Sequence, residues 1–182
     1  MKLIKNATAE KLRGGFYTPE PIAAFILKWG INGSLDSDVL EPSCGDGVFI
    51  EQLKDNNHKF NSITAIEFDE IEANKANQIQ LTNKEIINTD FHLYCNETAK
   101  RFDLVVGNPP YIRYQYFDED QQKEAIKVFE RAKLKYSKLT NAWVSFVVGS
   151  SLLLKEKGKI GFVIPAELLQ VSYAQQLREF LA

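Results

Sequence analysis

The chain has 182 residues, of which 45% are hydrophobic and 25% charged, and a formal net charge of -2. This usage fits one globular domain with a real core, and the small net charge argues against a whole-surface grip on nucleic acid. Two cysteines without CxxC spacing and two histidines exclude a disulfide framework and a zinc cluster, and no apolar run is long enough to span a membrane. We therefore expect a cytoplasmic protein without a metal site.

The first predicted element is a helix. Thr18 is expected to be its N-cap, with Pro19 at the first helical position and Gly30 just after its end. Apolar residues at helical spacing predict its core face, namely Ile22, Ala23, Phe25, Ile26 and Trp29.

The elements that follow alternate between strands and helices. In chain order we expect strand 39–42, turn 43–47, helix 48–54, strand 63–67, helix 71–81, strand 85–88, strand 102–107, helix 141–154, strand 159–164 and helix 166–181. The segment 113–138 is charged and rich in Gln, Lys and Tyr, which predicts a mobile excursion over the site with a helix inside it. The alternation predicts an α/β fold with a Rossmann-like, doubly wound, mostly parallel sheet in the order 3-2-1-4-5.

The turn after the first strand indicates a nucleoside ligand. Gly45-Asp46-Gly47 resembles half of a dinucleotide fingerprint, and Glu67 lies 20 residues past Gly47, where a carboxylate can bind ribose hydroxyls. Ile50 takes the place of the third glycine. The pattern therefore favours a ligand with a ribose but without a pyrophosphate.

Carboxylates follow each of the first three predicted strands. Glu41, Glu67 and Asp90 would meet at one edge of a parallel sheet, where they would attract a cation and repel a pyrophosphate. S-adenosylmethionine has that character, with its sulfonium, ammonium, ribose and adenine groups. The alternative is that Glu67 and Asp90 only cap the helices that follow them.

The loop after the fourth predicted strand carries the most specific motif, Asn108-Pro109-Pro110-Tyr111. The prolines stiffen the loop and leave carbonyl groups free to accept hydrogen bonds. The Asn108 side-chain oxygen and the Pro109 carbonyl can thus face an exocyclic amine, while Tyr111 offers an aromatic face to a flat ring. An ordinary Asn-Pro turn is the alternative.

Together these segments resemble a class I S-adenosylmethionine-dependent N6-adenine DNA methyltransferase of the restriction-modification type. The matching stretches are Gly15 to Pro19, Leu40 to Gly47, Ile66-Glu67, Thr89 to Phe91, Asn108 to Tyr111 and Gly158 to Pro165.

The resemblance implies a role for each matched residue. The methionine end of the cofactor would meet Tyr17, Thr18, Glu41 and the backbone of Ser43, Cys44 and Gly45, whereas the ribose would meet Glu67 and the adenine Asp90 and Phe91. Asn108, which lies beside the cofactor, and Pro109 would accept hydrogen bonds from the target amine. Tyr111 would stack on a target base flipped out of the duplex. Cys44 needs no reactive role as a small buried side chain.

The chain departs from this family at its C-terminal end. The seven-stranded methyltransferase sheet has two strands that cannot be fitted after Ile164, and neither can a target-recognition domain. We therefore expect residues 1–182 to be the N-terminal part of an enzyme, an incomplete catalytic domain. It would reach double-stranded DNA through regions or a partner not in this chain, and it could self-associate through the exposed edge of the sheet.

Two other functions remain open at this stage. Enzymes that methylate a protein glutamine or a guanine in ribosomal RNA share the Asn-Pro-Pro-Tyr loop, although Tyr17-Thr18-Pro19 points to the DNA group. A catalytically silent subunit that only binds the cofactor or a partner would also carry these residues.

Overall fold

A five-stranded sheet forms the centre of the molecule. Its strands are β1 (Asp38–Glu41), β2 (Ser62–Glu67), β3 (Lys84–Asn88), β4 (Phe102–Gly107) and β5 (Leu154–Phe162). They lie in the order β3-β2-β1-β4-β5, and each neighbouring pair is parallel, which confirms the predicted fold class and strand order. The structure is a computed structural model that describes residues 17–31, 36–56, 59–136, 141–166 and 175–181.

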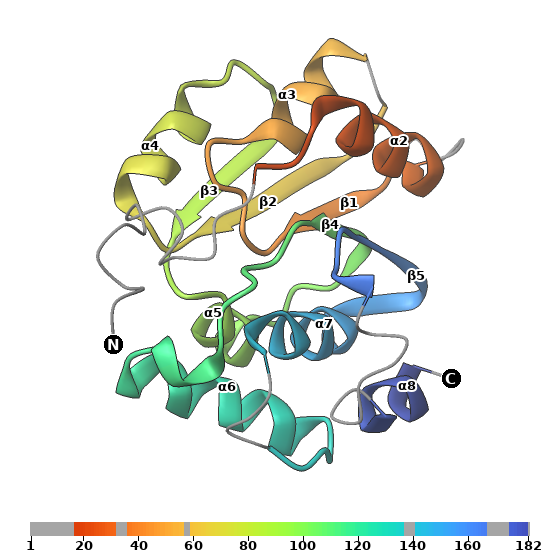
Figure 1. The fold of residues 1–182 in the computed structure, drawn as a ribbon. Helices are drawn as coiled ribbons and strands as arrows, with labels where there is room; N and C mark the ends of the chain where they lie inside the picture. Colours follow the sequence, from red (N-terminus) through yellow and green to blue (C-terminus); the bar gives the residue numbers. More distant parts are fainter. Residues whose placement is uncertain (1–16, 32–35, 57–58, 137–140, 167–174, 182) are drawn as a thin grey trace.

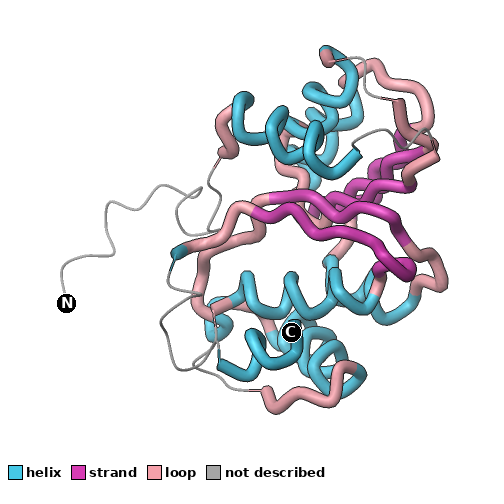
Figure 2. The backbone as a smooth tube through the Cα atoms, turned by 90° about the vertical axis from the view of Figure 1, so that its right-hand side faces the viewer, coloured by secondary structure: helices cyan, strands magenta, loops and turns pink. Residues whose placement is uncertain are grey.

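Helices cover both faces of the sheet, giving three layers (Figure 1, Figure 2). One face carries α2 (Glu20–Ile31), α3 (Val48–Asp55) and α4 (Glu70–Gln78), and the other carries α5 (Phe91–Glu97), α6 (Glu119–Arg131) and α7 (Ala142–Leu152). The short helix η1 (Tyr114–Tyr116) precedes α6, and α8 (Gln175–Leu181) follows β5. Within the described ranges, no helix has both the length and the apolar character needed to cross a membrane.

Each face of the sheet has its own hydrophobic core. The core beneath α2 and α3 is mostly aliphatic and includes Leu27 and Ile50. The core beneath α5 and α7 is rich in aromatic rings, among them Phe91, Trp143 and Phe146. Because both faces are covered, the central strands are continuous apolar runs rather than alternating ones.

Helix α2 runs further than the sequence predicts. Gly30 was expected just past its end, but the helix continues through Gly30 to Ile31. A Cβ atom at Gly30 would lie 2.6 Å from the Leu104 side chain on β4, so this glycine lets the helix approach the sheet closely.

The buried face of α2 also differs from the predicted one. Ile22, Phe25 and Trp29 were expected in the core, yet they are 42%, 71% and 49% exposed. The helix instead buries Ala23, Ile26, Leu27 and Ile31. Apolar residues lie around most of this helix, so periodicity alone cannot identify the face that meets the sheet.

Several helices and strands begin or end at residues other than the predicted ones. Helix α4 ends at Gln78 rather than at position 81, because Ile79 is already extended. Strand β5 begins at Leu154 rather than at position 159, with a register irregularity between Phe102 and Leu104 of β4. Helix α5 was not among the elements predicted in chain order, although the capping alternative for Asp90 assumed a helix there. Of the last predicted helix, 166–181, the described part is α8, and residues 167–174 lie outside the described residues.

The predicted excursion contains the expected helix, but it packs into the core. Ala125, Val128 and Phe129 of α6 are buried, and α6 packs against α5. Tyr114 and Phe117, which precede α6, belong to the same aromatic core. The described part of the segment, up to residue 136, is therefore packed against the rest of the domain, whereas the sequence predicted a mobile excursion over the site.

Candidate functional site

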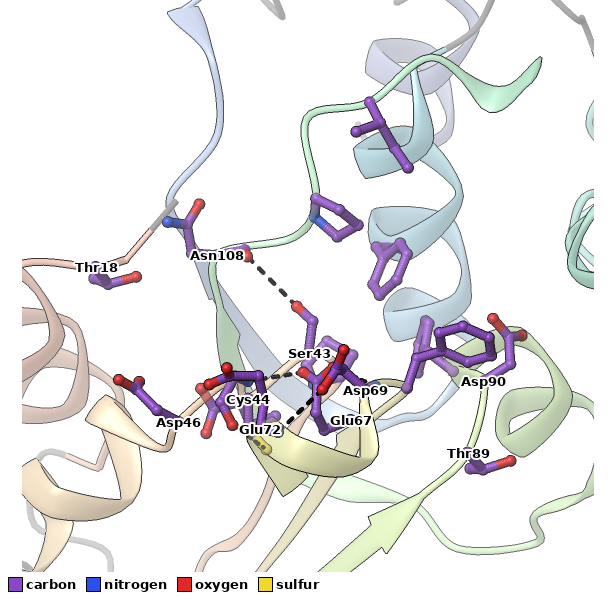
Figure 3. A pocket seen from close by; sticks show the side chains of 18 of the residues that line it. Thr18, Ser43, Cys44, Asp46, Glu67, Asp69, Glu72, Thr89, Asp90 and Asn108 are labelled. Atoms are coloured by element: carbon purple, nitrogen blue, oxygen red, sulfur yellow. Dashed lines mark hydrogen bonds between the residues drawn. The ribbon is translucent and has the colours of Figure 1, made fainter. Parts of the chain in front are cut away.

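A cavity of about 520 Å³ opens where β1, β2 and β4 end and continues past the end of β3 (Figure 3). The residues predicted to bind the cofactor all line it, namely Tyr17, Thr18, Glu41, Ser43, Cys44, Gly45, Glu67, Asp90, Phe91 and Asn108. They come from five separate stretches of the chain. Parallel strands bring their carboxyl ends to one edge, which is why these stretches meet.

The turn after β1 is fastened to the end of β2. The Cys44 backbone N–H donates to the Ile66 carbonyl at 2.9 Å, and the Gly45 N–H donates to Glu67 Oε2 at 2.8 Å. Gly47 has a φ of 101°, which favours glycine. A Cβ atom there would also lie 2.5 Å from Ile79 Cδ1 on the neighbouring helix–loop junction. The turn is thus held in a conformation that other residues would strain.

Glu67 does not cap the following helix. Its Oε1 accepts from the Asp69 N–H and its Oε2 from the Gly45 N–H, both at 2.8 Å. The N-cap of α4 is Asp69, whose side chain accepts from the backbone of Ile71 and Glu72. The helix-capping alternative is therefore wrong for Glu67, which instead faces the cavity and orders the turn.

Acidic side chains concentrate at one end of the cavity. Glu41 is only 1% exposed, and its Oε2 has no hydrogen-bond partner among the described residues. Burial, followed by the charges of Glu67 and Asp46, raises the pKa of Glu41 well above its usual range. Burial also raises the pKa values of Asp46 and Glu67. Such a group of carboxyls is suited to a ligand that carries positive charge.

Asp90 both caps a helix and lines the cavity. Its Oδ1 accepts from the N–H groups of His92 and Leu93 at 2.8 and 3.0 Å, so it is the N-cap of α5. Burial acts to raise the pKa of Asp90, but the hydrogen bonds that its carboxylate accepts, the one from His92 first, outweigh burial and lower that pKa. The capping role expected as an alternative is thus present, together with a carboxylate oxygen at the cavity.

Aromatic rings form the cavity wall around Asp90. Phe91 and Phe146 are stacked, with centroids 5.0 Å apart, and both line the cavity together with Phe117. Figure 3 places Thr89 and Asp90 at this end and Asp46 at the other. A flat apolar ring fits beside such a wall.

The Asn108 loop lies at the cavity next to the turn after β1. The Ser43 hydroxyl donates to the Asn108 carbonyl at 3.4 Å (Figure 3). The Tyr111 hydroxyl contacts both Asn108 Oδ1 and the Val163 carbonyl, the latter at 2.7 Å. Burial raises the pKa of Tyr111 to about 12, so its hydroxyl keeps its proton at neutral pH. The loop is thereby braced against the segment after β5.

Two of the predicted catalytic residues, Pro109 and Tyr111, are not among the described residues that line the cavity. Of the Asn-Pro-Pro-Tyr loop, only Asn108 and Pro110 belong to the lining.

Cys44 is 4% exposed, and burial raises the pKa of its thiol, in agreement with a packing role for its side chain.

Sequence reasoning missed part of the lining. The additional side chains include Phe68, Thr89, Ile112, Tyr116, Phe117, Gln121 and Phe146. Phe68 and Thr89 could have been found because they adjoin predicted site residues. The others lie on η1, α6, α7 and the connecting loops, for which no local sequence motif marked a role.

Comparison with known proteins agrees with this architecture. A solved structure from Listeria monocytogenes, described as a class I S-adenosylmethionine-dependent methyltransferase, superimposes with a TM-score of 0.69. It is 17% identical, and the match covers 96% of this chain and 58% of that one. The fold is therefore that of the class I S-adenosylmethionine-dependent methyltransferases.

Comparison of the sequence with known proteins identifies the family to which the chain belongs. The family model of the Eco57I restriction-modification methylases matches residues 18–182, and the chain belongs to that family. The type II methyltransferase M.AccI of Acinetobacter calcoaceticus is 30% identical over 169 residues, which are 91% of this chain and 30% of the relative. A tRNA1(Val) (adenine(37)-N6)-methyltransferase of Haemophilus influenzae is 29% identical over 133 residues, covering 70% of this chain and 53% of the relative. The chain thus spans about a third of the M.AccI length.

Proposed function

We propose that this chain is the catalytic part of a DNA methyltransferase that uses S-adenosylmethionine to methylate the N6 amine of adenine, within a restriction-modification system. The observation that carries the proposal is one cavity in which Asn108 of the Asn-Pro-Pro-Tyr loop faces the same space as Glu41, Glu67 and Asp90. A reacting amine and a cationic cofactor could then meet in one place.

The cavity fits this cofactor on its own chemistry. The buried Glu41 Oε2, which has no hydrogen-bond partner in the described part of the chain, would accept from an ammonium group, and Thr18 and Tyr17 would lie beside the methionine end. Glu67 retains lone pairs for ribose hydroxyls, because its Oε1 accepts the Asp69 N–H and its Oε2 the Gly45 N–H, and a carboxylate oxygen can accept more than one hydrogen bond. Asp90 and Phe91 would receive the adenine.

Asn108 and Pro109 would act on the target amine. The lone pair of an adenine amine is delocalised into the ring, which makes it a weak nucleophile. Hydrogen bonds from its two N–H groups to Asn108 Oδ1 and the Pro109 carbonyl would favour a pyramidal nitrogen and localise that lone pair. When bound, the cofactor would supply the electrophilic methyl group and would leave as S-adenosylhomocysteine. The Asn108 loop would position the amine for attack, and the methylated amine would lose its proton to solvent.

Tyr111 would hold the target base. Stacking on an aromatic side chain is worth about 1–3 kcal/mol per base and offsets part of the unstacking of a flipped nucleotide. For stacking, the Tyr111 ring would have to face the base in the complex, whether or not its hydroxyl still contacts Asn108 Oδ1. Recognition of the DNA sequence would come from parts of the protein outside this chain.

The test is methyl transfer by the complete gene product from radiolabelled S-adenosylmethionine, followed by nucleoside analysis. N6-methyladenine in duplex DNA is the expected product. Methyl-guanine, or a methyl-glutamine in protein, would contradict the proposal.

A second candidate is methylation of adenine in RNA. The relation to the tRNA adenine methyltransferase of Haemophilus influenzae favours it, because that relative is described as acting on the same amine. Duplex DNA and tRNA offered in the same assay separate the two, and labelling of tRNA alone would establish the second function.

A further inference from the structure

A side chain of helix α6, Gln121, contacts the Asp90 carboxylate at the aromatic end of the cavity. Gln121 Nε2 donates to Asp90 Oδ2 at 3.2 Å, and Gln121 itself lines the cavity. The other carboxylate oxygen, Oδ1, is already occupied by the two backbone N–H groups of α5. Gln121 is thus the side chain that determines where the second oxygen points.

The orientation of the Gln121 side-chain amide is fixed by the start of its own helix. The side-chain Oε1 accepts from the Asp118 backbone N–H at 3.2 Å, and the Gln121 backbone N–H donates to Asp118 Oδ1 at 2.8 Å, which together form a capping box. Because the carbonyl oxygen is used in this way, the amide nitrogen must face Asp90.

The helix that carries Gln121 is itself fastened to the helix that Asp90 caps. Asn96 Nδ2 of α5 donates to the Glu124 backbone carbonyl and to its Oε2, at 3.0 and 2.8 Å. Arg131 Nη1, at the other end of α6, donates to the Cys95 carbonyl at 2.7 Å. The distance between Gln121 and Asp90 is therefore set by the packing of two helices rather than by a free loop.

We propose that Gln121 is a positioning residue that aims the Asp90 carboxylate at the exocyclic amine of a bound adenine, and so makes the cavity prefer 6-amino over 6-oxo purine ligands. A carboxylate oxygen can accept two hydrogen bonds, so Oδ2 can hold the Gln121 amide and the amine together. A 6-oxo purine presents an acceptor there, which the carboxylate repels. The inference rests on the proposed function, since it takes the adenosyl group to lie at this end.

The experiment compares binding of S-adenosylhomocysteine and S-inosylhomocysteine by calorimetry. The original chain should prefer the adenosyl ligand. In Gln121→Leu, affinity for the adenosyl ligand should fall about ten-fold, as expected for one hydrogen bond to a charged group, while affinity for the inosyl ligand changes little. The preference should shrink accordingly.

Two further variants make the result specific. Gln121→Glu keeps an acceptor for the helix cap but places a second carboxylate beside Asp90, so it should lose at least as much adenosyl affinity as the Leu variant while remaining folded. Gln122→Leu is the matched control. Its Nε2 donates to the Phe117 carbonyl at 2.8 Å, within its own segment, and its loss should leave the preference unchanged.

The possible results distinguish a failure of this inference from a failure of the proposed function. An equal loss of both ligands in Gln121→Leu, or an unchanged preference, would show that Gln121 has only a structural role and would overturn the inference. If the original chain bound neither ligand, the proposed function would fail first, and the inference with it.

Discussion

The two ends of the cavity treat their carboxyl groups in opposite ways. At the end near β1, Glu41 is buried beside other acids, and its pKa is raised. At the end near α5, Asp90 receives hydrogen bonds from backbone groups and from Gln121, and its pKa is lowered. Both groups line one cavity, yet the protein stabilises the charge of only one of them.

This difference shows which carboxylate charge the protein itself stabilises and which one needs a positively charged ligand. At the end near α5, the Asp90 carboxylate already accepts hydrogen bonds from His92, Leu93 and Gln121, and the stacked rings of Phe91 and Phe146 form the wall. The Glu41 end holds acidic groups whose charges repel one another, which a cationic ligand would relieve. Binding of a cation should therefore affect the Glu41 end more than the Asp90 end.

The largest expected effect lies between the two ends, at Asn108. Asn108→Ala should reduce methyl transfer by about 10²–10³-fold, the usual cost of removing one pre-organised hydrogen-bonding group at a reacting centre. Affinity for S-adenosylhomocysteine should stay within a few-fold, because both ends remain intact. Single-turnover transfer and calorimetry on the same preparation measure the two. A parallel loss of cofactor binding would show that binding and reaction are not divided as proposed.

Substitutions of Tyr111 also test whether cofactor binding and reaction depend on different residues, with a smaller expected effect. Tyr111→Ala should weaken use of the target base by about 1–3 kcal/mol in kcat/KM, the value of one base–aromatic stack. Tyr111→Phe keeps the ring and loses only the contacts to Asn108 Oδ1 and the Val163 carbonyl, so it should lose much less. If the Phe variant were as poor as the Ala variant, the hydroxyl rather than the ring would be the important group.

Asp90→Ala should destabilise the fold at neutral pH. It removes the N-cap of α5, which is worth about 0.5–2 kcal/mol. Because the folded pKa of Asp90 is lowered, its stabilisation is present above the unfolded value and is lost as pH falls through the folded value. Urea unfolding at neutral and at acidic pH measures this, and a gap between the variants that persisted in acid would contradict the assignment.

Glu41→Gln should change the stability at neutral pH in the opposite direction. Since the folded pKa of Glu41 is raised, its contribution to stability is lost as pH rises above the unfolded value of about 4.3. The variant should therefore melt higher at neutral pH, by about 2–4 °C for each kcal/mol relieved, and the gain should vanish in acid.

The same substitution should weaken binding of the cationic cofactor, because the neutral amide cannot pair with an ammonium group. Thermal scans with and without the cofactor show both effects. A Gln variant that melts lower at neutral pH, and binds the cofactor as before, would mean that the two ends are not different in the way described.

Much of this site could be predicted from the sequence because its residues follow strands directly. Val39 to Glu41 and Phe102 to Gly107 are short apolar runs that end in marked turns, so Glu41 and Asn108 could be assigned to strand ends by local pattern. Prediction failed where several local solutions were equivalent. The apolar residues of α2 fit more than one face, and the short helix after Asp90 has no periodic stripe long enough to reveal it.

The sequence by itself determined the class of fold, the strand order and the acids and amide that meet at the sheet edge, because parallel topology carries every strand end to that edge. Only the tertiary structure decided that Gln121 and Phe146 join them, and that Glu41 and Asp90 differ in their protonation tendencies. The places of Gln121 and Phe146 are set by how α5, α6 and α7 pack, and the raised pKa of Glu41 by its burial beside Glu67 and Asp46. Neither leaves a signature in the local sequence.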